Sequence, residues 1–174
     1  KDNNAFDIGR RSQVAEESKA WDLNKAQLEK ISDGYVRLSL QLQAEFGLRR
    51  EEAIKFRPNY AIKADHIKLK ASWTKGGRAR TVPIRTDEQC RLLDDVRKLA
   101  RGGARIPPNK NYVDQQIRYD TQVRTSAIKN PHGLLHAFAQ RRYEELKGWK
   151  APVAGGPASN SLSSNHRALD YGER

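Results

Sequence analysis

The sequence predicts a mainly helical domain with a small three-stranded antiparallel β-sheet, an α+β fold. Two observations lead to this prediction. Over residues 92–99, leucine and valine recur at helical spacing, and further segments on both sides can be read as helices. Over residues 60–84, by contrast, apolar and polar side chains alternate with the period of a strand, around a Gly76-Gly77 pair that is typical of a turn.

The first helix is expected to begin near Asp22, after a polar lead-in. Either Asp22 or Asn24 can cap it, because both side chains accept hydrogen bonds from free N–H groups of a first helical turn. Asp33-Gly34 is expected to end it.

Residues 35–46 fit two patterns, a period-2 alternation and a single helical face. We predict a helix, because this segment contains glutamine, alanine and glutamate, which are poor strand formers. Gly47 is its expected stop. A short helix over residues 50–56 follows, and Pro58 is expected to end it.

Three strands are expected between Tyr60 and Ile84. Residues 60–62 form a short run. Residues 67–72 alternate apolar side chains with lysine and serine, and residues 81–84 form the expected third strand after the glycine turn. Lysine and arginine would line the rim of this sheet.

Helices are expected again from Thr86 to the end of the core. Thr86-Asp87-Glu88-Gln89 is a capping-box sequence with acids in the first turn, and the helix it opens runs to Gly102-Gly103. Asn130-Pro131 is a cap followed by a first-turn proline, which opens a helix over residues 131–147 that Gly148 ends.

Asn111 can cap the helix between these two. Val113 and Ile117 would share one face, but Val123 is out of step with them. We therefore expect a break near Asp120-Thr121 and a second short helix around Val123.

The charge of the chain favours a polyanionic partner. Lysine and arginine number 33 against 21 acidic residues, so the formal net charge is +12 and the sequence pI is about 10.0. Nucleic acid is the commonest partner of such a domain. A basic but unspecialised protein is the alternative.

Other classes are excluded or unsupported. The single Cys90 cannot form an internal disulfide and fits a reducing cytoplasm. No apolar run approaches the roughly 20 residues of a membrane span, and Lys1-Asp2-Asn3-Asn4 is no signal peptide. The histidines and the cysteine lack metal-ligand spacing, and no P-loop or dinucleotide fingerprint is present. We expect no metal and no cofactor.

Three separate segments carry chemistry, and their order matters. They are Gly47-Leu48-Arg49-Arg50-Glu51-Glu52, then Trp73-Thr74-Lys75-Gly76-Gly77-Arg78-Ala79-Arg80-Thr81-Val82-Pro83-Ile84, then His132-Gly133-Leu134-Leu135-His136. Together they resemble the catalytic domain of the tyrosine recombinases (phage-type integrases), whose patterns are G-L-R-x-x-E, a hairpin lysine and H-x-L-R-H. The resemblance covers roughly residues 22–150 and implies the catalytic-domain fold of that family.

Arg49 is the catalytic arginine that the resemblance implies, because G-L-R fixes the register against Arg50. A guanidinium suits this task, since its planar fork donates two hydrogen bonds to phosphate and keeps its charge. Glu52 can pair with a neighbouring arginine and hold the helix start. The alternative is a solvated charged turn.

Lys75 precedes the glycine turn, and the resemblance implies that it is the general acid toward the leaving 5′ oxygen. Lysine can lose its proton near other cations and so serve as an acid. Arg78 and Arg80, with Arg50, are the expected DNA contacts. The alternative is a hairpin rim that simply touches backbone phosphates.

His132 is the third implied catalytic residue, a donor to a non-bridging phosphate oxygen, with His136 as a supporting DNA-site residue. The departure is Leu135, which occupies the position of the family's second arginine and cannot donate to phosphate. The nucleophile is also unmatched. His166 and Tyr171 lie five residues apart without the expected glycine, so we expect that the chain stops before the nucleophile segment.

The resemblance also implies an organisation and a reaction. Residues 1–21 would be a linker or lead-in from an N-terminal DNA-binding domain, residues 22–148 the catalytic-type core, and residues 149–174, rich in Pro, Gly, Ser and Asn, a flexible insertion with the start of an unfinished segment. The parent protein would cleave and rejoin double-stranded DNA through a 3′-phosphotyrosine, as a homo-tetramer in the bacterial cytoplasm. This stretch alone would bind DNA without recombining it.

Two alternatives remain open from the sequence. One is a catalytically dead DNA-binding relative, in which Leu135 is a true loss. The other is a basic helical adaptor for RNA or a protein partner, with the three motif matches accidental.

Overall fold

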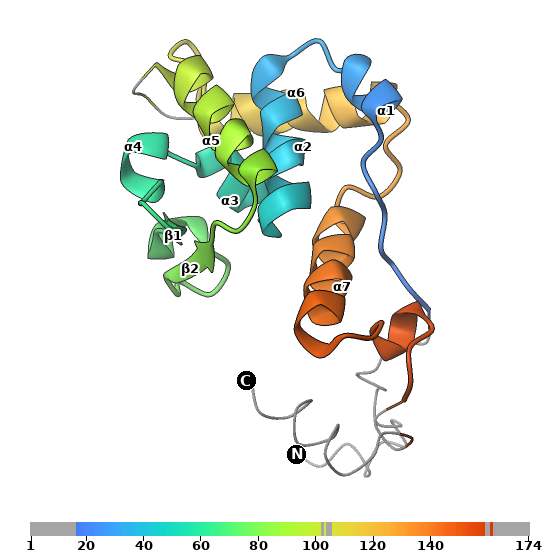
Figure 1. Cartoon of the computed structure of the whole chain (residues 1–174). Coiled ribbons are helices and arrows are strands. Elements are labelled where there is room, and N and C mark those ends of the chain that lie inside the picture. The colour runs from blue at the N-terminus through green and yellow to red at the C-terminus, as the bar shows by residue number, and fades with distance from the viewer. Residues whose placement is uncertain (1–16, 102, 104–105, 159–160, 162–174) are drawn as a thin grey trace, which may run out of the picture. The chain divides into compact units, whose positions relative to one another are not determined.

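The computed structural model describes residues 17–101, 103, 106–158 and 161. The chain divides into two compact units, residues 20–139 and residues 1–19 with 140–174, so that the boundary falls within the last long helix. Figure 1 labels the helices and strands. Their bounds are α1 Lys25–Glu29, α2 Gly34–Phe46, α3 Arg50–Lys55, α4 Pro58–Ala61, β1 His66–Leu69, the 3-10 turn η2 Ala71–Trp73, β2 Arg80–Pro83, α5 Asp87–Ala100, α6 Tyr112–Thr125, α7 Gly133–Lys147 and the 3-10 turn η3 Pro152–Ala154.

Most helix starts and stops follow the capping residues. Asn24 rather than Asp22 caps α1, accepting a hydrogen bond from the Gln27 N–H at 2.8 Å. The prediction that Asp33-Gly34 ends the first helix is wrong, because α1 already ends at Glu29, and Asp33 instead caps α2, which begins at Gly34. Thr86 and Gln89 form the expected capping box at the start of α5. The predicted α+β class, mainly helical with a small sheet, is confirmed.

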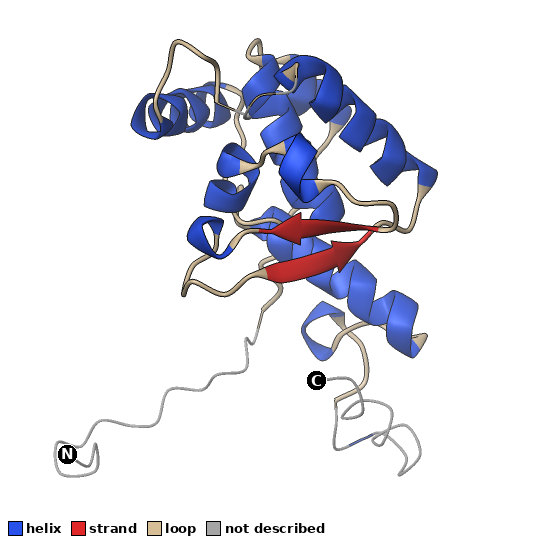
Figure 2. Cartoon of the chain, turned by 90° about the vertical axis from the view of Figure 1, so that its left-hand side faces the viewer, coloured by secondary structure: helices blue, strands red, loops and turns tan. Residues whose placement is uncertain are grey.

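The sheet has two strands in the described part of the chain, so the prediction of three strands is wrong. β1 and β2 pair antiparallel, with Ile67 opposite Val82 (Figure 2). The expected third strand is instead helix α4, because Pro58 has the φ that a first helical turn requires and the Ala61 N–H donates to the Arg57 carbonyl at 2.8 Å. Only Ile62 bridges to Ile67.

Helix α6 runs without the break that we expected near Asp120. Its buried face is formed by Gln115, Tyr119 and Val123, which are spaced four residues apart, whereas Val113 and Ile117 are exposed. The sequence analysis assigned the buried face to Val113 and Ile117, so Val123 appeared out of step. The predicted second short helix is also wrong, because the chain leaves the helix after Thr125.

Two clusters of buried side chains hold the unit of residues 20–139 together. One joins the end of α2, the sheet and α5, and the other joins α2 and α3 to α6 and the start of α7. The members of the second cluster are Ile31, Val36, Leu40, Ile54, Tyr119, Val123, Ile128 and Leu134.

The buried hydroxyl of Tyr119 lies in the second cluster and makes the stability of the fold sensitive to high pH. Gln43 Nε2 donates to this oxygen at 2.8 Å, and burial raises the pKa of Tyr119 well above its ordinary value. Above pH of about 10 the unfolded chain loses this proton while the folded chain keeps it, so the stability contribution is complete below pH 10 and declines above it.

We therefore expect the free energy of unfolding to fall less in Tyr119→Phe than in the parent chain between pH 8 and 10.5. All other titrating groups are common to the two proteins, so the difference between their pH profiles reports Tyr119. Tyr119→Phe should also cost about 1 kcal/mol at pH 8, because Gln43 loses a partner. Urea unfolding at the two pH values measures both effects. Parallel pH profiles for the two proteins would show that Tyr119 does not titrate differently on unfolding.

Residues beyond the core unit show one further expected feature. Gly148 follows α7 with φ of 78°, a left-handed conformation typical of a helix stop. Residues 149–158 contain the short turn η3, and the rest of the predicted insertion lies outside the described residues apart from Ser161. No described helix has the length and apolar character needed to cross a membrane.

Candidate nucleic-acid interface

The turn between α2 and α3 places Arg49. Gly47 takes a left-handed conformation with φ of 59°, Leu48 is buried, and Arg49 is the N-cap of α3. The ring of Phe138 lies directly over Gly47, since a Cβ built there would be 2.3 Å from Phe138 Cδ1. The turn that carries Arg49 is therefore held by α2 and α3, which it joins, and by the contact of Gly47 with Phe138 of α7.

A fully buried carboxylate holds the start of α3. Glu52 has an exposed fraction of 0%, and one of its oxygens accepts the Arg49 N–H at 2.8 Å. Arg49 Nη1 donates to the other oxygen at 3.4 Å, while 46% of the Arg49 side chain is exposed. An acidic group at a helix N-terminus is also favoured by the helix dipole. Glu52 thus anchors one side of the Arg49 guanidinium and leaves part of it accessible.

Arg80 is the second arginine on this carboxylate. It opens β2, and its Nη2 donates to Glu52 Oε2 at 2.7 Å and to the Gly47 carbonyl at 3.1 Å. The sequence analysis predicted Arg80 as a DNA contact, and the structure gives it a bond that ties the sheet to the Arg49 turn. About a third of the side chain, 36%, remains exposed. Glu52 therefore brings two guanidinium groups from distant segments to one place.

Arg50 lies apart from this cluster. Its Nη1 donates to Asp120 Oδ1 of α6 at 2.8 Å, and both side chains are about half exposed. The two adjacent arginines thus have different partners, with Arg49 on Glu52 and Arg50 on α6. The assignment of the phosphate-binding task to Arg49 stays a prediction from the sequence.

The loop between η2 and β2 carries Lys75 and Arg78. Gly76 and Gly77 have φ of 88° and 64°, and the Thr74 hydroxyl donates to the Arg78 carbonyl at 2.6 Å, which closes the loop. Both basic side chains are exposed, and neither makes a hydrogen bond or ion pair with any residue that the structure describes. They are available to an external anion.

The two predicted histidines lie at the start of α7, His132 directly before the helix and His136 in its first turn. Asn130 Oδ1 accepts the Gly133 N–H at 3.0 Å, and Leu134 is buried in the second cluster. The rings of His132 and His136 meet edge to face with centroids 5.1 Å apart. His132 is exposed, and His136 is half-buried. Leu135, at the position of the missing arginine, is half-buried.

The structure joins some of the predicted residues through contacts and leaves others separate. Arg49 and Arg80 share Glu52, and Phe138 packs the helix of the histidines against the Gly47 turn. Among the described residues, no hydrogen bond or ion pair joins Lys75 or His132 to Arg49. His166 and Tyr171 lie outside the described residues.

Sequence reasoning missed two parts of this arrangement. It foresaw that Glu52 would pair with an arginine, but the second partner, Arg80, lies 28 positions away, and no sequence pattern distinguishes it from Arg78. The contact of Phe138 with Gly47 also had no sequence signal apart from the glycine itself.

The arrangement is suited to binding phosphate without a metal. No group of three or more metal-ligating side chains occurs among the residues that were placed. Exposed cationic groups on a turn and a tight loop can donate hydrogen bonds to phosphate oxygens.

Comparison with known proteins gives one match. The family described as Integrase matches residues 7–141, which is most of the chain. No curated protein and no solved structure matches it.

Proposed function

This chain belongs to the integrase family, and we propose that it is the DNA-binding catalytic domain of a site-specific recombinase that works through a 3′-phosphotyrosine. The observation that supports this best is the buried Glu52, which holds the partly exposed Arg49 in a fixed turn. A buried carboxylate with two arginine partners is a costly arrangement to maintain. It serves a site in which a guanidinium must keep one position.

The proposed chemistry distributes three tasks over the predicted residues. A tyrosine oxygen attacks the scissile phosphorus, and the bond to the 5′ oxygen breaks. Arg49 stabilises the charge on the non-bridging oxygens, because its fork matches phosphate geometry. Lys75 gives its proton to the departing 5′ oxygen, and His132 donates to a non-bridging oxygen. The exposure of Lys75 and His132 supports these roles.

The DNA contacts of the proposal follow the exposed cations. Arg78 would contact backbone phosphate from the glycine loop, Arg50 and His136 would contribute at the margins, and Arg80 would act mainly by fixing Arg49. Residues 22–148 would form the catalytic-type core. The full-length protein would act as a homo-tetramer on two DNA sites in the bacterial cytoplasm.

Leu135 favours a second candidate, a catalytically dead relative that keeps its DNA surface. A leucine cannot donate to phosphate, and losing one such donor costs about 3–4 kcal/mol of transition-state stabilisation, as in oxyanion sites. We accordingly propose that this stretch is inactive in recombination as it stands. The two candidates share DNA binding and differ in whether covalent chemistry can be restored.

We expect Leu135→Arg to restore or raise covalent cleavage if the site is a weakened recombinase. Position 135 lies in the first turn of α7, three residues after His132, which directly precedes the helix, so we expect a guanidinium there to reach the side of His132. The protein from the full open reading frame would be offered a nicked suicide duplex, selected for binding from a random-sequence pool. Covalent protein–DNA adduct measured on a denaturing gel is the readout.

Leu135→Lys is the matched control, since lysine has a positive charge but no fork. We expect less adduct from Leu135→Lys than from Leu135→Arg. No adduct from either variant, with a lowered melting temperature for both, would support the dead relative, because the cations would then be buried without partners.

DNA binding itself is expected to depend steeply on salt. Between about 50 and 200 mM salt, the affinity for a duplex of about 30 base pairs should fall a hundredfold or more, because several phosphate contacts release counterions. Fluorescence anisotropy with a labelled duplex measures this. An affinity that stays flat over this range would remove DNA as the partner.

A further inference from the structure

A cavity lies where the start of α2 meets the end of α5, whereas Arg49 follows the opposite end of α2. Tyr35 near the start of α2 donates to the Leu99 carbonyl near the end of α5, at 3.5 Å. At the opposite ends of these helices, Gln89 donates to the Glu45 carbonyl at 2.7 Å. The 13 residues of α2 span about 18 Å at 1.5 Å per residue. The cavity is therefore distinct from the proposed DNA site.

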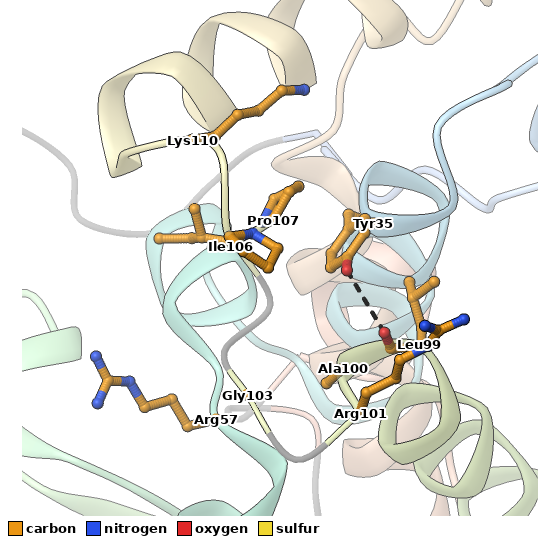
Figure 3. A pocket seen from close by; sticks show the side chains of 10 residues that line it. Tyr35, Arg57, Leu99, Ala100, Arg101, Gly103, Ile106, Pro107 and Lys110 are labelled. Carbon is orange, nitrogen blue, oxygen red and sulfur yellow. Dashed lines mark hydrogen bonds between the residues drawn. The ribbon is translucent and has the colours of Figure 1, made fainter.

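This cavity has an apolar floor and a basic margin. Its volume is about 670 Å³, within the usual range for ligand pockets. Tyr35, Leu99, Ile106 and Pro107 supply apolar surface, and Figure 3 shows them between Lys110 on one side and Arg101 on the other.

The charged residues at this margin are all cationic. They are Arg57, Arg101 and Lys110, and the described residues that line the cavity include no acidic side chain. Lys110 lies 4.0 Å from Asp33, whose carboxylate also pairs with Arg118 at 3.1 Å. Arg57 and Arg101 are exposed, and neither side chain bonds to a described residue. The Leu99 carbonyl near the end of α5 would repel an anion, but it accepts a hydrogen bond from the Tyr35 hydroxyl.

We propose that this cavity binds an acidic peptide segment of a partner protein, with an apolar side chain inserted between flanking carboxylates. Charge complementarity supports an acidic ligand, because Arg57, Arg101 and Lys110 are among the residues that line the cavity. The apolar floor distinguishes the ligand from a nucleic-acid backbone, which needs cations and has no apolar group to bury. An apolar anchor in a pocket with a charged margin is the usual form of a peptide contact.

The test uses three labelled nine-residue peptides and the whole 174-residue chain. The first peptide has a central Leu-Phe pair flanked by glutamates. The second has serines in place of that pair, and the third has lysines in place of the glutamates. We expect the first peptide to bind at least about tenfold more tightly than the serine peptide, because burial of one large apolar side chain alone accounts for such a factor. It should also bind more tightly than the lysine peptide, whose charges repel Arg57, Arg101 and Lys110.

Two variants locate the binding. Arg57→Glu changes the margin of the cavity, and Arg85→Glu is its matched control, an arginine ahead of α5 at the other end of that helix. Arg57→Glu should weaken the first peptide about fivefold or more, and Arg85→Glu less than twofold. Amide shifts on peptide addition, followed by NMR, should include Tyr35 and Ile106.

Several results would overturn the proposal. They are an equal loss in both arginine variants, equal binding of the serine peptide, or no binding of the first peptide at all. Binding of duplex DNA by Arg57→Glu, measured alongside its peptide binding, distinguishes a failure of this proposal from a failure of the proposed DNA function.

Discussion

Replacing Glu52 by alanine should lower the free energy of unfolding by about 2–4 kcal/mol, since removing one partner of a buried ion pair leaves the other charge uncompensated. Glu52 is completely buried and is bonded to Arg49 and Arg80. Both arginines are partly exposed, so water recovers some of the loss and the lower part of that range is expected. Chemical denaturation followed by circular dichroism measures it.

Glu51→Ala is the matched control for this variant. Glu51 is the neighbouring acid of α3. Among the described residues it forms an ion pair with Lys55, one helical turn away, and both side chains are partly exposed. Its loss should cost about 0.5 kcal/mol or less, as for other surface pairs. Glu52→Gln should fall between the two, because an amide oxygen still accepts the Arg49 N–H. Equal losses for Glu51→Ala and Glu52→Ala would show that the buried pair does not anchor the turn.

Gly47→Ala is expected to have a comparable effect for a different reason. Gly47 has φ of 59°, and a left-handed alanine costs about 1–2 kcal/mol. The new methyl group would also lie within 2.3 Å of the Phe138 ring, so the ring or α7 would have to move. Overpacking of this kind adds about 1–3 kcal/mol. We expect a total loss of about 2–5 kcal/mol in the free energy of unfolding.

Gly148→Ala separates the two causes. Gly148 also follows a helix with positive φ, at 78°, but nothing lies within 4 Å of a Cβ built there. Gly148→Ala should therefore cost only the conformational part, about 1–2 kcal/mol. If Gly47→Ala costs no more than Gly148→Ala, the contact with Phe138 does not constrain the turn.

The sequence predicted the parts of the fold that depend on local interactions. The capping box of Thr86 and Gln89 fixed the start of α5, and Gly47 marked the end of α2, because caps and left-handed glycines act within a few residues. The position of Arg49 between a helix stop and a helix start was also predicted locally, while its catalytic role stays a prediction from the resemblance.

Features that depend on distant partners were not predicted. The period-2 run before the hairpin was predicted as a strand, but Pro58 starts a helix there, and the segment is joined to the sheet by one isolated β-bridge, between Ile62 and Ile67. In α6 the buried face includes a glutamine and a tyrosine whose hydroxyl is bonded to Gln43, so apolar spacing identified the wrong face. The bond of Arg80 to Glu52 was not predicted, because the two residues lie 28 positions apart in the sequence.

The most direct test of the proposed phosphate site is the salt dependence of DNA affinity in single variants. Arg49→Gln and Lys75→Gln each remove one exposed cation, and Lys30→Gln, an exposed lysine beyond the end of α1, is the control. The account predicts that each of the first two variants lowers the slope of log Kd against log salt by about one, and that the control leaves it unchanged. Slopes for Arg49→Gln and Lys75→Gln equal to that of the parent chain would contradict it.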